Sequence, residues 1–97
     1  MTLQILGTWD FDGCVSTHYL AEEIGDGLPM HEHPINHTCK VEAGEVKITV
    51  AARTKIMGPL ENPVDLPGNT PHSIIATQPM TRFTNTLPRN AAQGTTA

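Results

Sequence analysis

Hydrophobic and polar residues alternate along much of this chain, which is the pattern of half-buried β-strands. In residues 46–50 (VKITV) every second side chain is apolar, so one face of this segment is expected to pack against a core. The same alternation is present in residues 37–42 and 15–21. The segments predict short strands, each with one buried face.

Turn residues divide the chain into short pieces. Eight glycines and eight prolines are spread along it, and the longest stretches without either are residues 14–24, 35–43 and 45–57. Thr, Val and Ile together total 25 residues, which favours strands over helices. Short strands separated by turns predict an antiparallel sandwich or barrel. We expect one domain over residues 1–87 and a frayed tail over residues 88–97.

One hairpin is predicted from the residues between two of these strands. Residues 42–45 (EAGE) join the strand that ends near Val41 to the strand 46–50, and Gly44 can adopt the positive φ of a tight turn. In this prediction the two strands pair with each other. His37 and Cys39 then point into the same interior as the apolar side chains of residues 46–50.

Composition and charge exclude several classes of function. The 97 residues carry a net charge of −4 and only six Lys and Arg, so no basic surface for nucleic acid or anionic lipid is expected. No apolar run approaches the ~18 residues of a membrane span. The first positive residue is Lys40, which argues against a secretory signal. Two cysteines, Cys14 and Cys39, predict free thiols in a reducing cytoplasm.

Three histidines lie within seven residues and carry the most specific chemical signal. His31 and His33 are two residues apart, so on a strand both rings project from one face. A helix is disfavoured because Pro29 and Pro34 flank the pair. We therefore expect a strand through His31 and a turn after Pro34, with His37 at the start of the next strand.

The spacing of the three imidazoles favours a metal site over solvated turn histidines. An imidazole that points into an apolar interior needs a partner, and three on one side of a strand pair suit a transition metal. A fourth histidine, His72, follows a turn at residues 66–71 (LPGNTP) and opens a β-rich run. Taken alone, His72 is more typical of a turn histidine.

These residues resemble the first sequence motif of the cupin family of β-barrels. The motif G-x5-H-x-H-x3-4-E-x6-G is matched in every spacing by Gly25, His31, His33, His37 and Gly44. The difference is His37, which stands where the family usually has glutamate.

The second cupin motif, G-x5-P-x-G-x2-H-x3-N, is matched more loosely. Pro67 and His72 keep their spacing, whereas Glu61, Asn69 and Ala76 occupy the positions of the two glycines and the final asparagine. Asparagine tolerates a left-handed backbone better than other non-glycine residues, so we expect the turn at Asn69 to form.

The resemblance implies a fold and a ligand set. The fold is a small antiparallel cupin-type β-barrel (a double-stranded β-helix, or jelly roll), all-β, with a metal near one mouth and usually a homodimer. The implied ligands are His31, His33, His37 and His72, which would hold one divalent transition metal: Fe, Ni, Cu, Zn, Co or Mn. Four neutral imidazoles leave the metal with its full charge of about +2. This charge favours a small anionic or enolisable molecule as ligand or substrate.

Two other residues are expected near the site, and no catalytic residue is identified. Cys39 shares a face with His37, and a buried small hydrophobe is favoured over a redox thiol for it. Tyr19 lies on an alternating strand; if it faces inward, its hydroxyl could donate to a bound oxyanion, although core packing is the favoured role. No aspartate or glutamate stands out as a general base, so the chemistry would come chiefly from the metal.

Three functions are compatible with the sequence. The first is a metal-dependent, dioxygenase-like enzyme that acts on a small anionic or enolisable molecule. The second is a metal-assisted isomerase, lyase or epimerase, and the third is a non-catalytic cupin that binds a small molecule. A barrel fold does not choose among them, because cupins host unrelated chemistries.

Overall fold

The computed structural model describes residues 3–11, 13–32 and 34–88, and within these ranges the chain forms nine strands and no helix. The strands are β1 (Leu3–Phe11), β2 (Cys14–Ala21), β3 (Gly27–His31), β4 (His37–Ala43), β5 (Val46–Val50), β6 (Arg53–Met57), β7 (Val64–Leu66), β8 (His72–Ala76) and β9 (Thr81–Pro88). Residue 88 therefore belongs to a strand, and the remainder of the predicted tail, residues 89–97, lies outside the described residues. In the described part of the chain no helix could cross a membrane.

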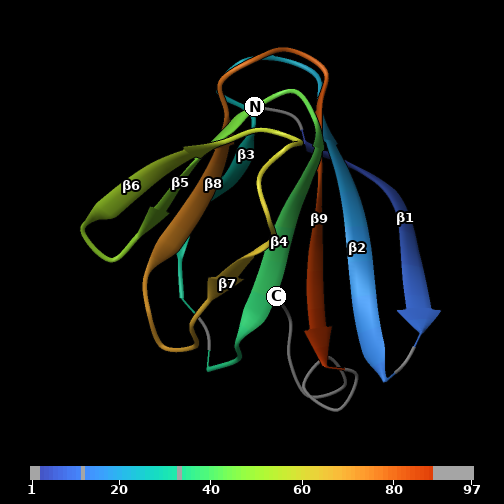
Figure 1. Ribbon diagram of the computed structural model, residues 1–97, viewed down its shortest axis with the longest axis vertical. Helices are drawn as coiled ribbons and strands as arrows, with labels where there is room; N and C mark the ends of the chain where they lie inside the picture. Colours follow the sequence, from blue (N-terminus) through green and yellow to red (C-terminus); the bar gives the residue numbers. More distant parts are fainter. Residues whose placement is uncertain (1–2, 12, 33, 89–97) are drawn as a thin grey trace.

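The strands form two antiparallel sheets that face each other (Figure 1). The five-stranded sheet has the order β1-β2-β9-β4-β7, and the four-stranded sheet has the order β3-β8-β5-β6. Every strand pair is antiparallel. The prediction of an all-β antiparallel sandwich or barrel is confirmed.

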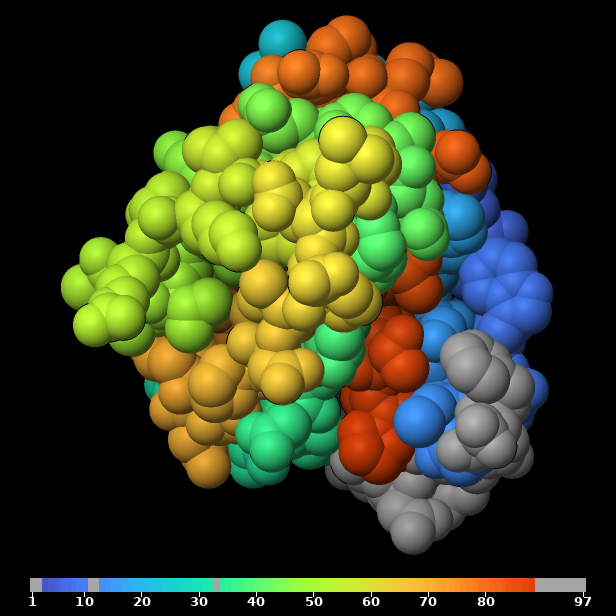
Figure 2. All heavy atoms as spheres, in the orientation of Figure 1, coloured from blue at the N-terminus to red at the C-terminus, as the bar shows by residue number. Residues whose placement is uncertain are grey.

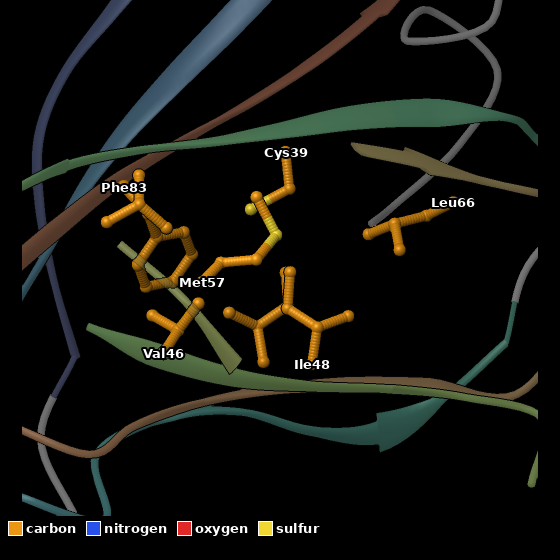
Figure 3. Close-up of a cluster of buried hydrophobic side chains, with 8 residues drawn as sticks. Cys39, Val46, Ile48, Met57, Leu66 and Phe83 are labelled. Atoms are coloured by element: carbon orange, nitrogen blue, oxygen red, sulfur yellow. The ribbon is translucent and has the colours of Figure 1, made fainter. Parts of the chain in front are cut away.

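A single apolar core fills the space between the sheets (Figure 3). The five-stranded sheet contributes inward side chains such as Val41 and Phe83, and the four-stranded sheet contributes Val46, Ile48 and Ile74, all at most 2% exposed. Burial of one such side chain stabilises the fold by about 1.5–3 kcal/mol. The alternation of β4, with Cys39 and Val41 buried and the residues between them more exposed, follows the predicted period of two.

The predicted hairpin between β4 and β5 is wrong. β4 pairs with β7 and β9, whereas β5 pairs with β6 and β8, so Gly44 and Glu45 carry the chain from one sheet to the other. The buried faces of β4 and β5 consequently oppose each other across the core instead of lying side by side. Alternation specifies which face of a strand is buried, but a sandwich crossing and a hairpin both satisfy that pattern.

The crossing at Gly44 depends on a close approach to β9. Gly44 has a φ of 80°, and a Cβ at this position would lie 2.8 Å from Thr81 Cα and closer still to the Thr81 hydroxyl. The same hydroxyl accepts a hydrogen bond from the Glu45 backbone N–H at 3.2 Å. Glycine is required here both by the left-handed backbone and by the lack of space.

β1 is an edge strand whose far side has no strand partner among the described residues. Its side chains Ile5, Leu6 and Trp9 are 64%, 48% and 50% exposed. An apolar edge of this length is a feature that proteins usually cover. The homodimer stays a prediction.

Substitution of Gly44 tests the crossing. We expect Gly44→Ala to lower the free energy of unfolding by more than about 3 kcal/mol, because a left-handed alanine costs about 1–2 kcal/mol and the Cβ also collides with Thr81. Gly13 is a matched control, since its φ is 75° and a Cβ there meets nothing within 4 Å. Urea unfolding should show a loss for Gly13→Ala of only about 1–2 kcal/mol. Equal losses for the two variants would contradict the proposed contact.

Candidate metal centre

Three of the four predicted ligand histidines meet at one end of the barrel. His31 ends β3, while His37 begins β4 and His72 begins β8. In the ladder between β3 and β8, His31 and His72 are direct partners. The ring centroids of His31 and His72 are 4.4 Å apart, and those of His37 and His72 are 4.9 Å apart. These strand ends lie together at the lower end of the molecule in Figure 1.

Two loops that precede the histidines are tied to each other. The Gly68 backbone N–H donates to the Asn36 side-chain oxygen at 2.6 Å. A Cβ at Gly68 would lie 2.9 Å from the Ile35 backbone nitrogen, so only glycine allows the loops to approach this closely. Asn69 has a φ of 58°, which confirms the expected left-handed turn. Together these contacts bring His37 and His72 to the same end of the barrel.

Backbone carbonyls orient two of the rings. His31 Nδ1 lies 2.6 Å from the Pro29 carbonyl oxygen, and His72 Nδ1 lies 2.9 Å from that of Thr70. A carbonyl only accepts hydrogen bonds, so Nδ1 carries the proton in each pair. In the neutral ring the lone pair is then on Nε2. A carbonyl bonded to the second nitrogen in this way is a common feature of histidines that bind metals.

The cluster is largely buried, but the described part of it is not a ready-made metal site. His37 is 5% exposed and His72 is 1% exposed. Within residues 3–11, 13–32 and 34–88 no group of three or more His, Cys, Asp or Glu side chains is arranged to hold a metal ion. The fourth predicted ligand, His33, lies outside the described residues.

A cavity of about 410 Å³ lies at the same end of the five-stranded sheet and has His37 among its lining residues, but Thr38 and Asp65 line it from the face of the sheet opposite to the inward His37 side chain. It opens where the ends of β4 and β9 lie side by side, on the face shown in Figure 2. Its lining combines apolar Leu66 and Leu87 with the polar side chains of Thr38 and Asp65. The Thr38 hydroxyl donates to Asp65 Oδ1 at 3.1 Å. The volume and mixed lining suit a small molecule with a few hydroxyl groups.

The structure places the two other predicted site residues inside the barrel. Cys39 is fully buried in the core, one inward position beyond His37 on β4. Burial raises the pKa of its thiol to about 12, so it carries no thiolate at neutral pH. Tyr19 faces inward and stacks on Phe83 with a centroid distance of 5.2 Å. Partial burial also raises the pKa of Tyr19.

Two residues that were not predicted to belong to the site, His18 and Asn85, carry buried polar groups in the structure. His18 lies on the outer face of β2, where its ring contacts Trp9, and its Nε2 is buried with no hydrogen-bond partner in the described chain. Asn85 of β9 is 7% exposed and faces inward. The signal for Asn85 was present in the alternation of residues 83–87 (FTNTL), which places a polar side chain at an inward position.

Comparison with solved structures identifies the fold. A cupin superfamily protein from Desulfitobacterium hafniense superposes with a TM-score of 0.75 at 14% identity, over 90% of this chain and 77% of that protein. An RmlC-like cupin from Shewanella frigidimarina gives a TM-score of 0.70 at 14% identity, over 90% and 83% of the two chains. A cupin 2 conserved barrel domain protein from Leptotrichia buccalis gives 0.71 at 24% identity, over 90% and 40%.

The fold is therefore the small cupin-type β-barrel, as predicted from the two motifs. No protein-family model matches the sequence, and no curated protein matches it significantly. At these identities the likeness establishes the architecture, and the chemistry has to be argued from the side chains.

Thiol reactivity tests the different environments of the two cysteines. Cys14 is half-buried and lines the cavity, whereas Cys39 is fully buried. We expect an aromatic disulfide reagent at pH 8 to modify one thiol per chain in the native protein and two in guanidinium chloride. The Cys14→Ser variant should show no rapid reaction before unfolding. Rapid reaction of that variant would contradict the buried position of Cys39.

Proposed function

We propose that the histidine cluster binds one divalent transition metal and that the protein is a metal-dependent enzyme acting on a small hydroxylated or enolisable molecule. The observation that carries the proposal is the convergence of His31, His37 and His72 at one end of a cupin-type barrel. His33, two residues from His31 in the sequence, is the fourth proposed ligand.

The donor set fits such a metal. The carbonyls of Pro29 and Thr70 hold the Nδ1 protons of His31 and His72, so each ring offers an Nε2 lone pair. Neutral imidazole suits Fe, Ni, Cu, Zn and Co. Because no three described side chains form a ready site, binding has to include His33 or a reorientation of the described rings.

The residues around the cluster have separable roles. A bound transition metal supplies a Lewis acid and, if it is Fe, Ni or Cu, a redox-active centre. The buried core beside His72 excludes water from the interior side of the cluster.

A dioxygenase-like reaction is the particular chemistry that we propose first. An all-nitrogen donor set leaves the full charge of a divalent metal uncompensated, which favours an enolate or another anionic oxygen of the substrate. The protein contributes orientation and water exclusion, because Cys39 is protonated and buried and is unsuited to act as a nucleophile or base.

Metal content tests the site. We expect purified protein to bind one equivalent of a divalent transition metal and His72→Ala to lose tight binding, because one ligand and its carbonyl-fixed ring are removed. His18→Ala is a matched control, since His18 lies on the outer face of the sheet and contacts Trp9. Elemental analysis after dialysis measures both variants. Retention of stoichiometric metal by His72→Ala, or an equal loss in His18→Ala, would contradict the assignment.

Oxygen uptake tests the reaction. We expect the protein loaded with iron, nickel or copper to consume oxygen in the presence of a β-diketone, flavonol, catechol or keto acid, and metal-loaded His18→Ala to do the same. An oxygen electrode makes the measurement, with His72→Ala as the inactive variant. Turnover of a hydroxylated substrate by the zinc protein without oxygen would instead favour a metal-assisted isomerase or lyase. Metal binding without any turnover would favour a binding protein.

A further inference from the structure

Asn85 is a polar side chain in an otherwise inward-packed strand. The buried positions of β9 are Thr81, Phe83 and Asn85, and the alternate residues, such as Thr84, are more exposed. Phe83 belongs to the apolar core, whereas Asn85, 7% exposed, places a primary amide in the same wall of the barrel. A central strand at such a position ordinarily carries an apolar residue.

The carbonyl oxygen of this amide has no hydrogen-bond partner in the part of the chain that the structure describes. Asn85 Oδ1 is buried, and it makes no hydrogen bond with any described residue. Its neighbours in the sheet are Cys39 of β4 and Thr17 of β2, and neither supplies a donor to it. Leaving an acceptor buried and unpaired costs folding free energy, so such a group calls for a function or a bound molecule.

The register places Asn85 next to the histidine cluster. Cys39 is its direct partner on β4, and His37 is the next inward residue on that strand. Asn85 and His37 are therefore diagonal neighbours on one face of adjacent strands, about 7–8 Å apart at Cα. A molecule of a few heavy atoms bound at the cluster spans this separation. On β9, Asn85 is the next buried residue after the core residue Phe83 in the direction of the histidine end of the barrel.

We propose that Asn85 is a positioning residue, whose Oδ1 accepts a hydrogen bond from a donor group on the molecule bound at the histidine cluster. This inference rests on the proposed metal site and narrows its substrate class. An acceptor selects a ligand that presents an O–H or N–H group, so an α-hydroxy acid or an enol is favoured over an α-keto acid. A ligand without such a group cannot make this hydrogen bond, and we expect it to bind more weakly.

A pair of ligands with one carbon skeleton isolates this hydrogen bond. L-Lactate carries a hydroxyl where pyruvate carries a ketone, so the two differ chiefly in the donor. We expect metal-loaded wild-type protein to bind L-lactate about tenfold more tightly than pyruvate, as measured by isothermal titration calorimetry. In Asn85→Leu and in the smaller Asn85→Ala the ratio should fall to about one. Thr84→Val, a less buried neighbour on the same strand, should keep the wild-type ratio.

Thermal unfolding of the metal-free variants separates ligand positioning from a structural role. We expect Asn85→Leu to melt at the wild-type temperature or above it, because the unpaired acceptor is gone. A fall of more than about 5 °C in both Asn85 variants would show that the amide serves the fold and would overturn the proposal. A wild-type protein without preference for lactate, or Asn85 variants that retain the preference, would overturn it as well.

Elemental analysis before the titrations distinguishes failure of the proposed metal site from failure of the proposed role of Asn85. Failure of wild-type protein to take up any metal would overturn the metal site, and the role of Asn85 with it. Stoichiometric metal in wild type and variants, with equal affinity for the two acids throughout, would overturn the role of Asn85 alone. Metal binding together with a lactate preference that disappears only in the Asn85 variants supports both.

Discussion

Packing between the two sheets sets the position of every strand end at which a histidine lies. The inward side chains of β4 and β9 meet those of β5 and β8 in one core, and a one-residue slip in any of these strands would turn its buried face to solvent. The register is strongly specified for that reason. It makes His31 the partner of His72 and places His37 at the same end of the barrel. The site is thus a consequence of how the core packs.

The loops at that end fix the positions and orientations of the histidine rings more closely than the strand register alone does. Asn36 bonds to the Gly68 backbone and joins the loop before β4 to the loop before β8. Two carbonyls then select the tautomers of His31 and His72, and the lone pairs lie on Nε2. Preorganisation of this kind lowers the entropy that a ring loses when it binds a metal or substrate.

The polarity of the inward side chains changes along the barrel. Phe83 and Val41 lie toward one end and are fully buried in apolar contacts, whereas Asn85 and His37 lie toward the other and bring polar atoms into the wall. Cys39 lies between these two pairs, and burial, which outweighs the opposing charge of Lys40, raises the pKa of its thiol to about 12, so the thiol stays protonated.

The sequence by itself determined the strand faces and the cupin-type fold. The alternation around Cys39 and Val46 identified buried positions, because the faces of a strand alternate with a local period of two residues. The cupin-type barrel was indicated by the resemblance of the segment with His31 and His37 to the family's first motif. Only the tertiary structure decided that β4 and β5 lie in different sheets and that Asn85 lies beside the cluster. Strand pairing depends on contacts between residues far apart in the chain, and those contacts leave no periodic signal in any one segment.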